Sequence, residues 1–329
     1  MALALTGMKP TGTPHLGNYL GMIRPALDLA RDHETYYFVA DHHALTTQPD
    51  PDQLRQRTRE VGATWLACGL DPARSVVYRQ SDVPEIHELA WILSCVTAKG
   101  LLNRAHAYKA AVADNEAHGR DPDDGVNAGL YGYPVLMAAD IVAPRADLVP
   151  VGGDQEQHVE VTRDIVGAFN ARYGDVLTQP QGVVDGDVAT IVGLDGRKMS
   201  KSYGNVIPIL APSDRLRRAV ARIRTDSRRP EEPKDPETCT VFALYRHVAD
   251  PEAVAAMRAR YRDGGVGYAE AKQELFEVLD ERFREPRRRH AELMDDPAEV
   301  DRLLASGTPA VRERAAGTLT SVRRAVGIS

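Results

Sequence analysis

Hydrophobic positions follow two different periods over the first two hundred residues of the chain. Short continuous apolar and β-branched runs predict buried strands, and segments with an apolar residue every three or four positions predict amphipathic helices. The predicted strands are 2–6, 35–40 and 75–80, and the predicted helices are 17–31, 51–69 and 84–100. Strands and helices that alternate in this way predict an α/β fold with a Rossmann-like, doubly wound parallel sheet.

The pattern changes twice further along the chain. Residues 101–130 keep helical spacing around a centre rich in Gly and Asp, which predicts a helical insertion with an exposed loop. Beyond about residue 206 only helical patterns remain. We therefore expect an α/β domain over residues 1–205 and an all-α C-terminal domain over residues 206–329.

Composition adds limits on the class and location of the protein. Hydrophobic residues make up 43% of the chain and charged residues 27%, which excludes a disordered or fibrous protein. The most apolar stretches are shorter than a membrane span, and the chain opens with no secretory signal pattern. Cys68, Cys95 and Cys239 are widely spaced and form no CxxC pair. We expect a cytoplasmic protein without disulfides, structural zinc or a membrane partner.

The net charge of −6 hides an asymmetry between the two predicted domains. Residues 206–329 carry 23 Lys and Arg against 21 Asp and Glu, so the acidic excess lies in residues 1–205. The basic residues of the C-terminal region are mostly arginines in groups, as at 215–224 and 285–290. Such groups suit nucleic-acid phosphates, and they equally suit a solvated helix face.

The loop that follows the first predicted strand, GMKPTGTPHLGN at 7–18, is rich in glycine and proline. At a strand-to-helix junction these residues bring backbone N–H groups and a helix N-terminus close to a phosphate. They also occur in ordinary βα turns, so the loop alone leaves both interpretations open.

A second cluster, GRKMSKS at 196–202, places Lys198 and Lys201 around Ser200 in a Gly-rich loop. Two ammonium groups with hydroxyls and backbone amides suit a polyphosphate whose charge rises during a reaction. A lysine-serine cluster in a surface loop is more often only solubilising. Two such loops in one α/β domain indicate a phosphate-binding site far more specifically than either loop does alone.

PTGTPHLGN and KMSKS resemble the HIGH and KMSKS signatures of class I aminoacyl-tRNA synthetases. YPVLMAADI at 133–141, DLVPVGGDQEQHVEVTRDI at 147–165 and RTDS at 224–227 resemble tryptophanyl-tRNA synthetase in particular, and the resemblance covers nearly the whole chain. It implies activation of L-tryptophan by ATP with Mg²⁺, and transfer of tryptophan to tRNA(Trp) by a homodimer. It implies Mg²⁺ bound through the ATP phosphates rather than by the protein, and no DNA partner.

The same resemblance implies an ATP site built from both loops and a third segment. His15, Lys9, Lys198 and Lys201 are expected to act in catalysis by stabilising charge on phosphoryl oxygens. The implied ATP-binding residues are Lys9, Pro10, Thr11, His15, Gly17, Asn18, Gly152, Gly153, Asp154, Ile191, Lys198, Met199, Ser200, Lys201 and Ser202.

Recognition of tryptophan is expected to centre on the middle segment. By the resemblance, Asp140 accepts a hydrogen bond from the indole N–H and Met137 packs on the ring. Without the family, an aspartate near the end of an apolar helix is more often a satisfied polar residue. The implied tryptophan-binding residues are Asp140, Met137, Tyr133, Gln155, His43, Val149, Val151 and Leu5, the last standing where many members have an aromatic residue.

Three alternatives remain at this point. Tyrosyl-tRNA synthetase shares the fold, both signatures and a GGDQ stretch, but we would expect Gln where Met137 stands. A nucleotidylyltransferase shares the first loop but normally lacks KMSKS. The third is an auxiliary or non-charging paralogue of the tryptophanyl enzyme.

The helical C-terminal region is expected to bind the anticodon. Arginines of its two basic groups would then contact the phosphate backbone. Examples are Arg217, Arg218, Arg222, Arg287 and Arg288.

Overall fold

The structure is a computed structural model that describes residues 1–151, 156–183 and 191–328. Five parallel strands form one sheet in the order β3-β2-β1-β4-β5. Their bounds are β1 (Leu3–Met8), β2 (Glu34–Val39), β3 (Val76–Arg79), β4 (Leu148–Pro150) and β5 (Gln181–Val183). The strand order reverses at β1, so the prediction of a Rossmann-like, doubly wound sheet is confirmed.

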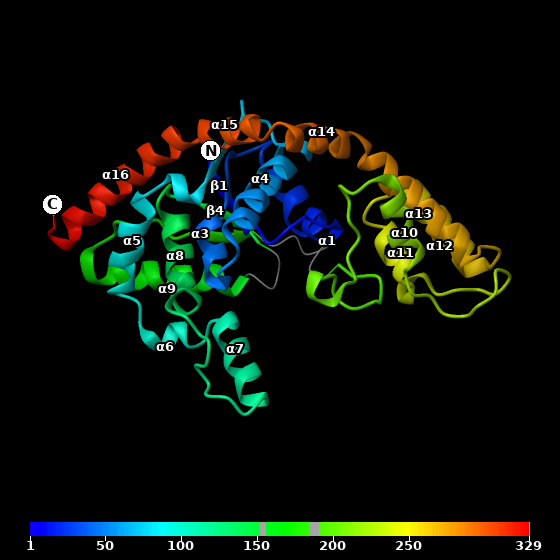
Figure 1. Cartoon of the computed structure of the whole chain (residues 1–329), viewed down its shortest axis with the longest axis horizontal. Coiled ribbons are helices and arrows are strands. Elements are labelled where there is room, and N and C mark those ends of the chain that lie inside the picture. The colour runs from blue at the N-terminus through cyan, green and yellow to red at the C-terminus, as the bar shows by residue number, and fades with distance from the viewer. Residues whose placement is uncertain (152–155, 184–190, 329) are drawn as a thin grey trace.

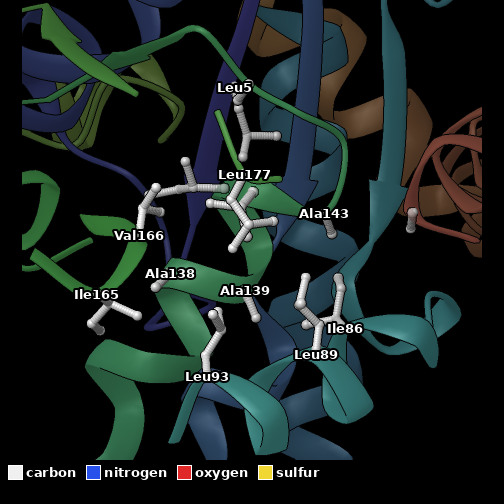
Figure 2. Packing of buried hydrophobic residues seen from close by; sticks show 14 of the residues in the cluster. Leu5, Ile86, Leu89, Leu93, Ala138, Ala139, Ala143, Ile165, Val166 and Leu177 are labelled. Carbon is white, nitrogen blue, oxygen red and sulfur yellow. The ribbon is translucent and has the colours of Figure 1, made fainter. Parts of the chain in front are cut away.

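Helices cover both faces of this sheet. Tyr36 and Phe38 of β2 face a core formed with α5 (Glu85–Ser94), α8 (Ala128–Val142) and α9 (Glu156–Tyr173). Figure 2 shows part of this core, with Leu5 of β1 above the α8 alanines. Tyr37 and Val39 point the other way, into a core with α4 (Pro51–Ala67). Alternate strand residues are therefore buried on opposite faces, which explains the continuous apolar runs.

The helix predicted over 17–31 forms in three consecutive pieces. α1 (Leu16–Asn18) and α2 (Arg24–Leu29) are joined by a π-helical turn over Tyr19–Ile23. The wide turn ends just before Pro25, whose missing N–H interrupts the usual ladder of hydrogen bonds.

The prediction of a single helix over 84–100 is wrong at the C-terminal end of that helix. α5 already ends at Ser94, where the hydroxyls of Ser94 and Thr97 donate to the carbonyls of Ala90 and Leu93. Gly100 then lies inside the next helix, α6 (Lys99–Leu102), rather than stopping the previous one. The helix therefore ends well before the glycine, next to two hydroxyls that bond to backbone carbonyls and can bend a helix.

A helical insertion does follow, as the pattern predicts. α7 (His106–Ala117) and the turns after it project with α6 from the body of the sheet domain (Figure 1). The buried Asn115 donates to the carbonyls of Pro122 (3.0 Å) and Asp124 (2.8 Å), which holds the polar loop of the insertion against α7.

All the regular elements that the structure describes after residue 206 are helices, joined by loops such as 223–235. The helices are α10 (Ser213–Ala221), α11 (Thr240–Tyr245), α12 (Pro251–Asp263), α13 (Tyr268–Arg282), α14 (Arg284–Asp295), α15 (Pro297–Ser306) and α16 (Thr308–Val326). α10–α13 form a core that also includes Leu16 and Leu20 from the start of the chain. No described helix is both long and apolar enough to cross a membrane.

The last three helices return over the sheet domain as a long arc (Figure 1). Val300 and Leu304 of α15 join the core on one face, and Val311 and Leu319 of α16 join the core on the other. Between them Gly307 lies so close to edge strand β3 that an added Cβ would be 2.3 Å from the carbonyl oxygen of Val77. The C-terminal region is thus anchored on the edge of the sheet.

Candidate active site

A cavity of about 450 Å³ opens at the carboxyl ends of β1, β2 and β4. This is the point where the strand order reverses, and doubly wound sheets bind ligands there. The sequence-predicted residues that line the cavity are Leu5, Lys9, Thr11, Asn18, His43, Tyr133, Met137, Asp140 and Val149. The fold therefore brings residues that are far apart in the sequence into one site.

Asp140 occupies the deep end of this cavity. Its side chain is 1% exposed and accepts from Nε2 of His43 (2.9 Å) and from Nε2 of Gln80 (2.9 Å to each oxygen). His43 comes from α3 (Asp41–Ala44) directly after β2, and Gln80 comes directly after β3. The carboxyl ends of two strands thus supply the donors that hold Asp140 in place.

An aromatic wall stands beside Leu5. Phe38 of β2 lines the cavity and stacks on Tyr78, with ring centroids 5.6 Å apart. A Cβ on Gly7 would lie 2.3 Å from the Phe38 ring, so glycine is needed for the ring to lie against β1. Sequence reasoning missed Phe38, because the run TYYFVA does not say which of its aromatic residues faces the site.

Tyr133 closes the opposite wall. Its hydroxyl lies 2.6 Å from Nε2 of His158 on α9, and burial raises its pKa. His158 also lines the cavity. It follows the GGDQ stretch by only a few residues, and its place within the segment DLVPVGGDQEQHVEVTRDI could have indicated it.

The other end of the cavity is basic. Nζ of Lys9 donates to Oγ1 of Thr46 (3.0 Å), and burial lowers the pKa of Lys9. Thr11 and Asn18 line the same end. Thr46 was not predicted, because nothing in its sequence context marks it.

His15 lies at the start of the helix that follows the first loop. It is 7% exposed, and its backbone N–H donates to Oδ1 of Asn18 (3.1 Å). Burial, together with the positive charge of Lys201, lowers the pKa of His15 to about 4. The imidazole is therefore neutral near pH 7, and it adds no positive charge to this end of the site.

The KMSKS loop lies directly against the first loop. Nζ of Lys201 donates to the carbonyl of Gly12 (2.7 Å), and burial lowers the pKa of this lysine. The Met199 sulfur lies 3.3 Å from the backbone nitrogen of Gly17. A Cβ on Gly17 would be 3.1 Å from the His15 ring and 3.4 Å from this sulfur. The two loops predicted to act together are in contact.

Asn205 fixes the shape of the KMSKS loop from within. Its Oδ1 accepts from the N–H of Ser200 (2.8 Å), and its Nδ2 donates to the carbonyl of Lys198 (3.0 Å). Ser200 and Ser202 share a 2.8 Å hydrogen bond between their hydroxyls. Lys198 is exposed at the surface of this loop, whereas the Lys201 ammonium is directed at the first loop.

The remaining predicted residues lie beside the cavity or outside the described residues. Pro10 is buried between Lys9 and Thr11, and the buried Ile191 accepts from the N–H of Met199 through its carbonyl (2.8 Å). Val151 is partly buried and packs against the core at the end of β4. Predicted positions outside the described residues are Gly152, Gly153, Asp154 and Gln155.

Known proteins are similar to this chain in sequence and in fold. Residues 2–284 match the family described as tRNA synthetases class I (W and Y). The tryptophan–tRNA ligase of Pseudomonas aeruginosa is 52% identical over 329 residues, covering 98% of this chain and 73% of that protein. The tryptophan–tRNA ligase of Neisseria meningitidis is 48% identical, covering 98% of this chain and 97% of that protein.

A solved structure is similar over the same length. Tryptophanyl-tRNA synthetase from Campylobacter jejuni, complexed with ADP and tryptophan, superposes with a TM-score of 0.88 at 39% identity over 99% of each chain. The chain belongs to the tryptophanyl branch of the class I aminoacyl-tRNA synthetases. The predicted resemblance is confirmed, and the nucleotidylyltransferase and tyrosyl alternatives are set aside.

Proposed function

We propose that this chain activates L-tryptophan with ATP, giving tryptophanyl-AMP and pyrophosphate, and then transfers tryptophan to the 3′ end of tRNA(Trp). The observation that carries the proposal is the polarity of one cavity. A buried carboxylate, Asp140, lies at its apolar end, and Lys9 lies at its other end beside the joined loops.

The first step is an in-line attack of the tryptophan carboxylate on the α-phosphate. Because the protein forms no covalent bond with the substrate, its contribution is to position the reactants and to stabilise charge on phosphoryl oxygens. Lys9 would contact the phosphates from the first loop. Lys198 and Lys201 would contact the leaving pyrophosphate from the KMSKS loop.

The first loop would place ATP against a helix start. Pro10 and Thr11 would run along the phosphates, and Gly17 would allow the nucleotide to approach where a Cβ would obstruct it. His15 is held neutral and would act as a hydrogen-bonding group. The other proposed ATP contacts are Asn18, Gly152, Gly153, Asp154, Ile191, Met199, Ser200 and Ser202.

Magnesium would enter with the nucleotide. Among the described residues, no group of three or more His, Cys, Asp or Glu side chains could hold a metal ion. Lys9 and Lys201 supply positive charge at the phosphate end and cannot ligate a cation. We therefore propose that Mg²⁺ is coordinated by ATP phosphate oxygens, where it neutralises charge during the attack.

Tryptophan would lie with its indole toward Asp140. The carboxylate would accept from the indole N–H, and Met137 and Val149 would pack on the ring. Phe38 and Leu5 would provide the flat apolar wall beside it. Tyr133, His43, Gln155 and Val151 complete the proposed tryptophan contacts.

The C-terminal helices would bind tRNA, but four of the five arginines indicated by the sequence are engaged within the chain. Arg217 donates to Gln273 (2.9 Å), and Arg218 pairs with Asp214 (2.6 Å). Arg287 forms an ion pair with Asp280 (2.9 Å), and Arg288 pairs with Glu285 and Glu292. These arginines are less suited to free phosphate contacts than the pattern suggests.

A groove on α12 is better suited to RNA. It has a volume of about 520 Å³ and is lined by Arg246, Arg258 and Arg262 over an apolar floor that includes Val254. Arg246 and Arg258 both pair with the same Glu237, so the positive charge of the groove exceeds the negative. Arginine beside an apolar floor is suited to a phosphate next to an unstacked base.

We further propose a cytoplasmic homodimer. Trp91 on α5 is 72% exposed, and tryptophan at a protein surface is enriched at interfaces. Its exposure supports a contact between two copies of the chain on this side.

Aminoacylation of a tRNA that carries a CCA anticodon tests the proposed function. The expected result is ATP-dependent attachment of tryptophan to this tRNA. Activation of tryptophan without transfer would identify a non-charging paralogue, and attachment of another amino acid would overturn the proposal.

A further inference from the structure

Gln80 is a fully buried polar residue at the carboxyl end of the edge strand β3. It is 0% exposed and begins the short 3-10 turn Gln80–Asp82. Gln80 is not among the described residues that line the cavity. Its side chain nevertheless bonds directly to Asp140, which does line it.

The neighbours of Gln80 determine which way its amide faces. The backbone N–H groups of His42 (3.1 Å) and His43 (3.4 Å) point at one amide atom. A backbone N–H can only donate, so this atom is the oxygen, Oε1. The amide nitrogen must then face Asp140, where it lies 2.9 Å from both carboxylate oxygens.

Gln80 therefore joins three elements of the site. It bonds to the backbone of α3 and to Asp140 of α8 from the end of β3. The same α3 carries His43, the other donor to Asp140. With two donors fixed behind it, the carboxylate cannot rotate freely, and its remaining acceptor positions face the cavity.

We propose that Gln80 is a positioning residue that sets the selectivity of the enzyme for an amino acid with an indole N–H. It acts by fixing the Asp140 carboxylate in the orientation that accepts this N–H. The proposal rests on the proposed function, in which Asp140 binds the indole. A misplaced acceptor would weaken binding of a ring that donates, and would matter little to a ring that does not.

The test compares two amino acids that differ at one ring atom. β-(3-Benzothienyl)-L-alanine has sulfur where tryptophan has the indole N–H. ATP–pyrophosphate exchange gives kcat/KM for each amino acid with the wild type, Gln80→Met and Gln80→Glu. Gln80→Met keeps the side-chain length and removes the amide. Gln80→Glu keeps an oxygen that can accept from His42 and His43, and when ionised it replaces the donor to Asp140 by a second negative charge.

In Gln80→Met we expect kcat/KM for tryptophan to fall by about 10- to 100-fold, mainly through a higher KM. For the analogue we expect kcat/KM to fall by less than about 3-fold, because its ring has no N–H to donate to Asp140. In Gln80→Glu, selectivity for tryptophan should recover as the pH falls, because the introduced carboxyl group, once protonated, again donates to Asp140. The exposed Gln53 gives the matched control, Gln53→Met, which should leave both values unchanged.

If Gln80 had a purely structural role, kcat/KM would fall equally for both amino acids. Selectivity for tryptophan would then not recover at low pH in Gln80→Glu. Either result, or an unchanged tryptophan value in both variants, would overturn the proposal. The analogue also reports on folding, since it still needs an intact site. If the wild-type enzyme supports no tryptophan-dependent exchange, the proposed function itself fails, which separates the two outcomes.

Discussion

The sulfur of Met199 lies 3.3 Å from the backbone nitrogen of Gly17, which joins two motifs that are 182 residues apart in the chain. Lys201 strengthens the contact by donating to the carbonyl of Gly12. Met199 is buried in the core that α10–α13 share with Leu16. The position of the KMSKS loop over the first loop is thus tied to the packing of the C-terminal helices.

Loss of the Lys201 charge should slow activation without weakening tryptophan binding. In Lys201→Gln, we expect kcat for ATP–pyrophosphate exchange to fall by about 10²- to 10³-fold, the typical effect of removing one preorganised donor to a developing anion. The exposed Lys99→Gln is the matched control and should match the wild type. An unchanged kcat in Lys201→Gln would rule out a role for this lysine in the chemical step.

A methyl group at Gly17 should interfere with ATP. An alanine Cβ would lie 3.1 Å from the His15 ring and 3.4 Å from the Met199 sulfur of the KMSKS loop, so these side chains would have to shift. We expect Gly17→Ala to raise KM for ATP by about 10-fold, the equivalent of a modest overpacking cost. Gly21→Ala in the same helical segment is the control, because an added Cβ there meets nothing within 4 Å. Equal KM values for the two variants would contradict this prediction.

The low pKa of His15 should make folding stability depend on pH. The folded-state pKa of about 4 lies below the ordinary value of 6.5, so the unfolded chain binds a proton first as the pH falls. The stability linked to His15 is therefore complete above pH 6.5 and is lost between pH 6.5 and 4, by at most about 1.4 kcal/mol per pH unit.

Urea unfolding at pH 7 and pH 5 measures this effect. Between these two values His15→Gln should lose less stability than the wild type. The exposed His118→Gln serves as the control and should lose as much as the wild type. If His15→Gln and the wild type lose the same amount, the imidazole is not held neutral by the fold.

The arginines of the α12 groove should matter for tRNA and not for activation. We expect the double variant Arg258→Ala, Arg262→Ala to lower kcat/KM for tRNA charging by about 10-fold or more, and less so at high salt. ATP–pyrophosphate exchange without tRNA should be unchanged. Arg31→Ala, which removes an exposed arginine that follows α2, is the control. Equal charging by the double variant and the control would place the tRNA contact elsewhere.

Much of the α/β domain could be predicted from the sequence, because its apolar runs and helical spacings are strong local signals. The two signature loops could be paired because both suit a phosphate and both resemble signatures of one family. Gln80 and Phe38 were missed because their roles depend on which strands become neighbours, and strand order is not a local property. Gln80 did carry a signal, as a polar residue at the carboxyl end of a predicted buried strand.

The return of the C-terminal helices over the sheet was also beyond the sequence pattern. The helices after residue 206 are visible as a separate all-α region, but their partners are not. The contact of Gly307 with the backbone of Val77 shows how such a region is anchored. A glycine within a helical pattern looks like an ordinary helix boundary, and only the three-dimensional contact reveals its second role.

We expect one cavity to bind both the indole, at Asp140, and the ATP phosphates, beside Lys9. ATP–pyrophosphate exchange by the wild-type enzyme with L-tryptophan and with L-tyrosine tests it most directly. We expect exchange with tryptophan, and a kcat/KM for tyrosine lower by roughly 10⁴-fold or more, because a site built to accept the indole N–H leaves Asp140 unpaired with a wrong ring. Exchange that responds to tyrosine and not to tryptophan would show that this cavity does not select the indole ring.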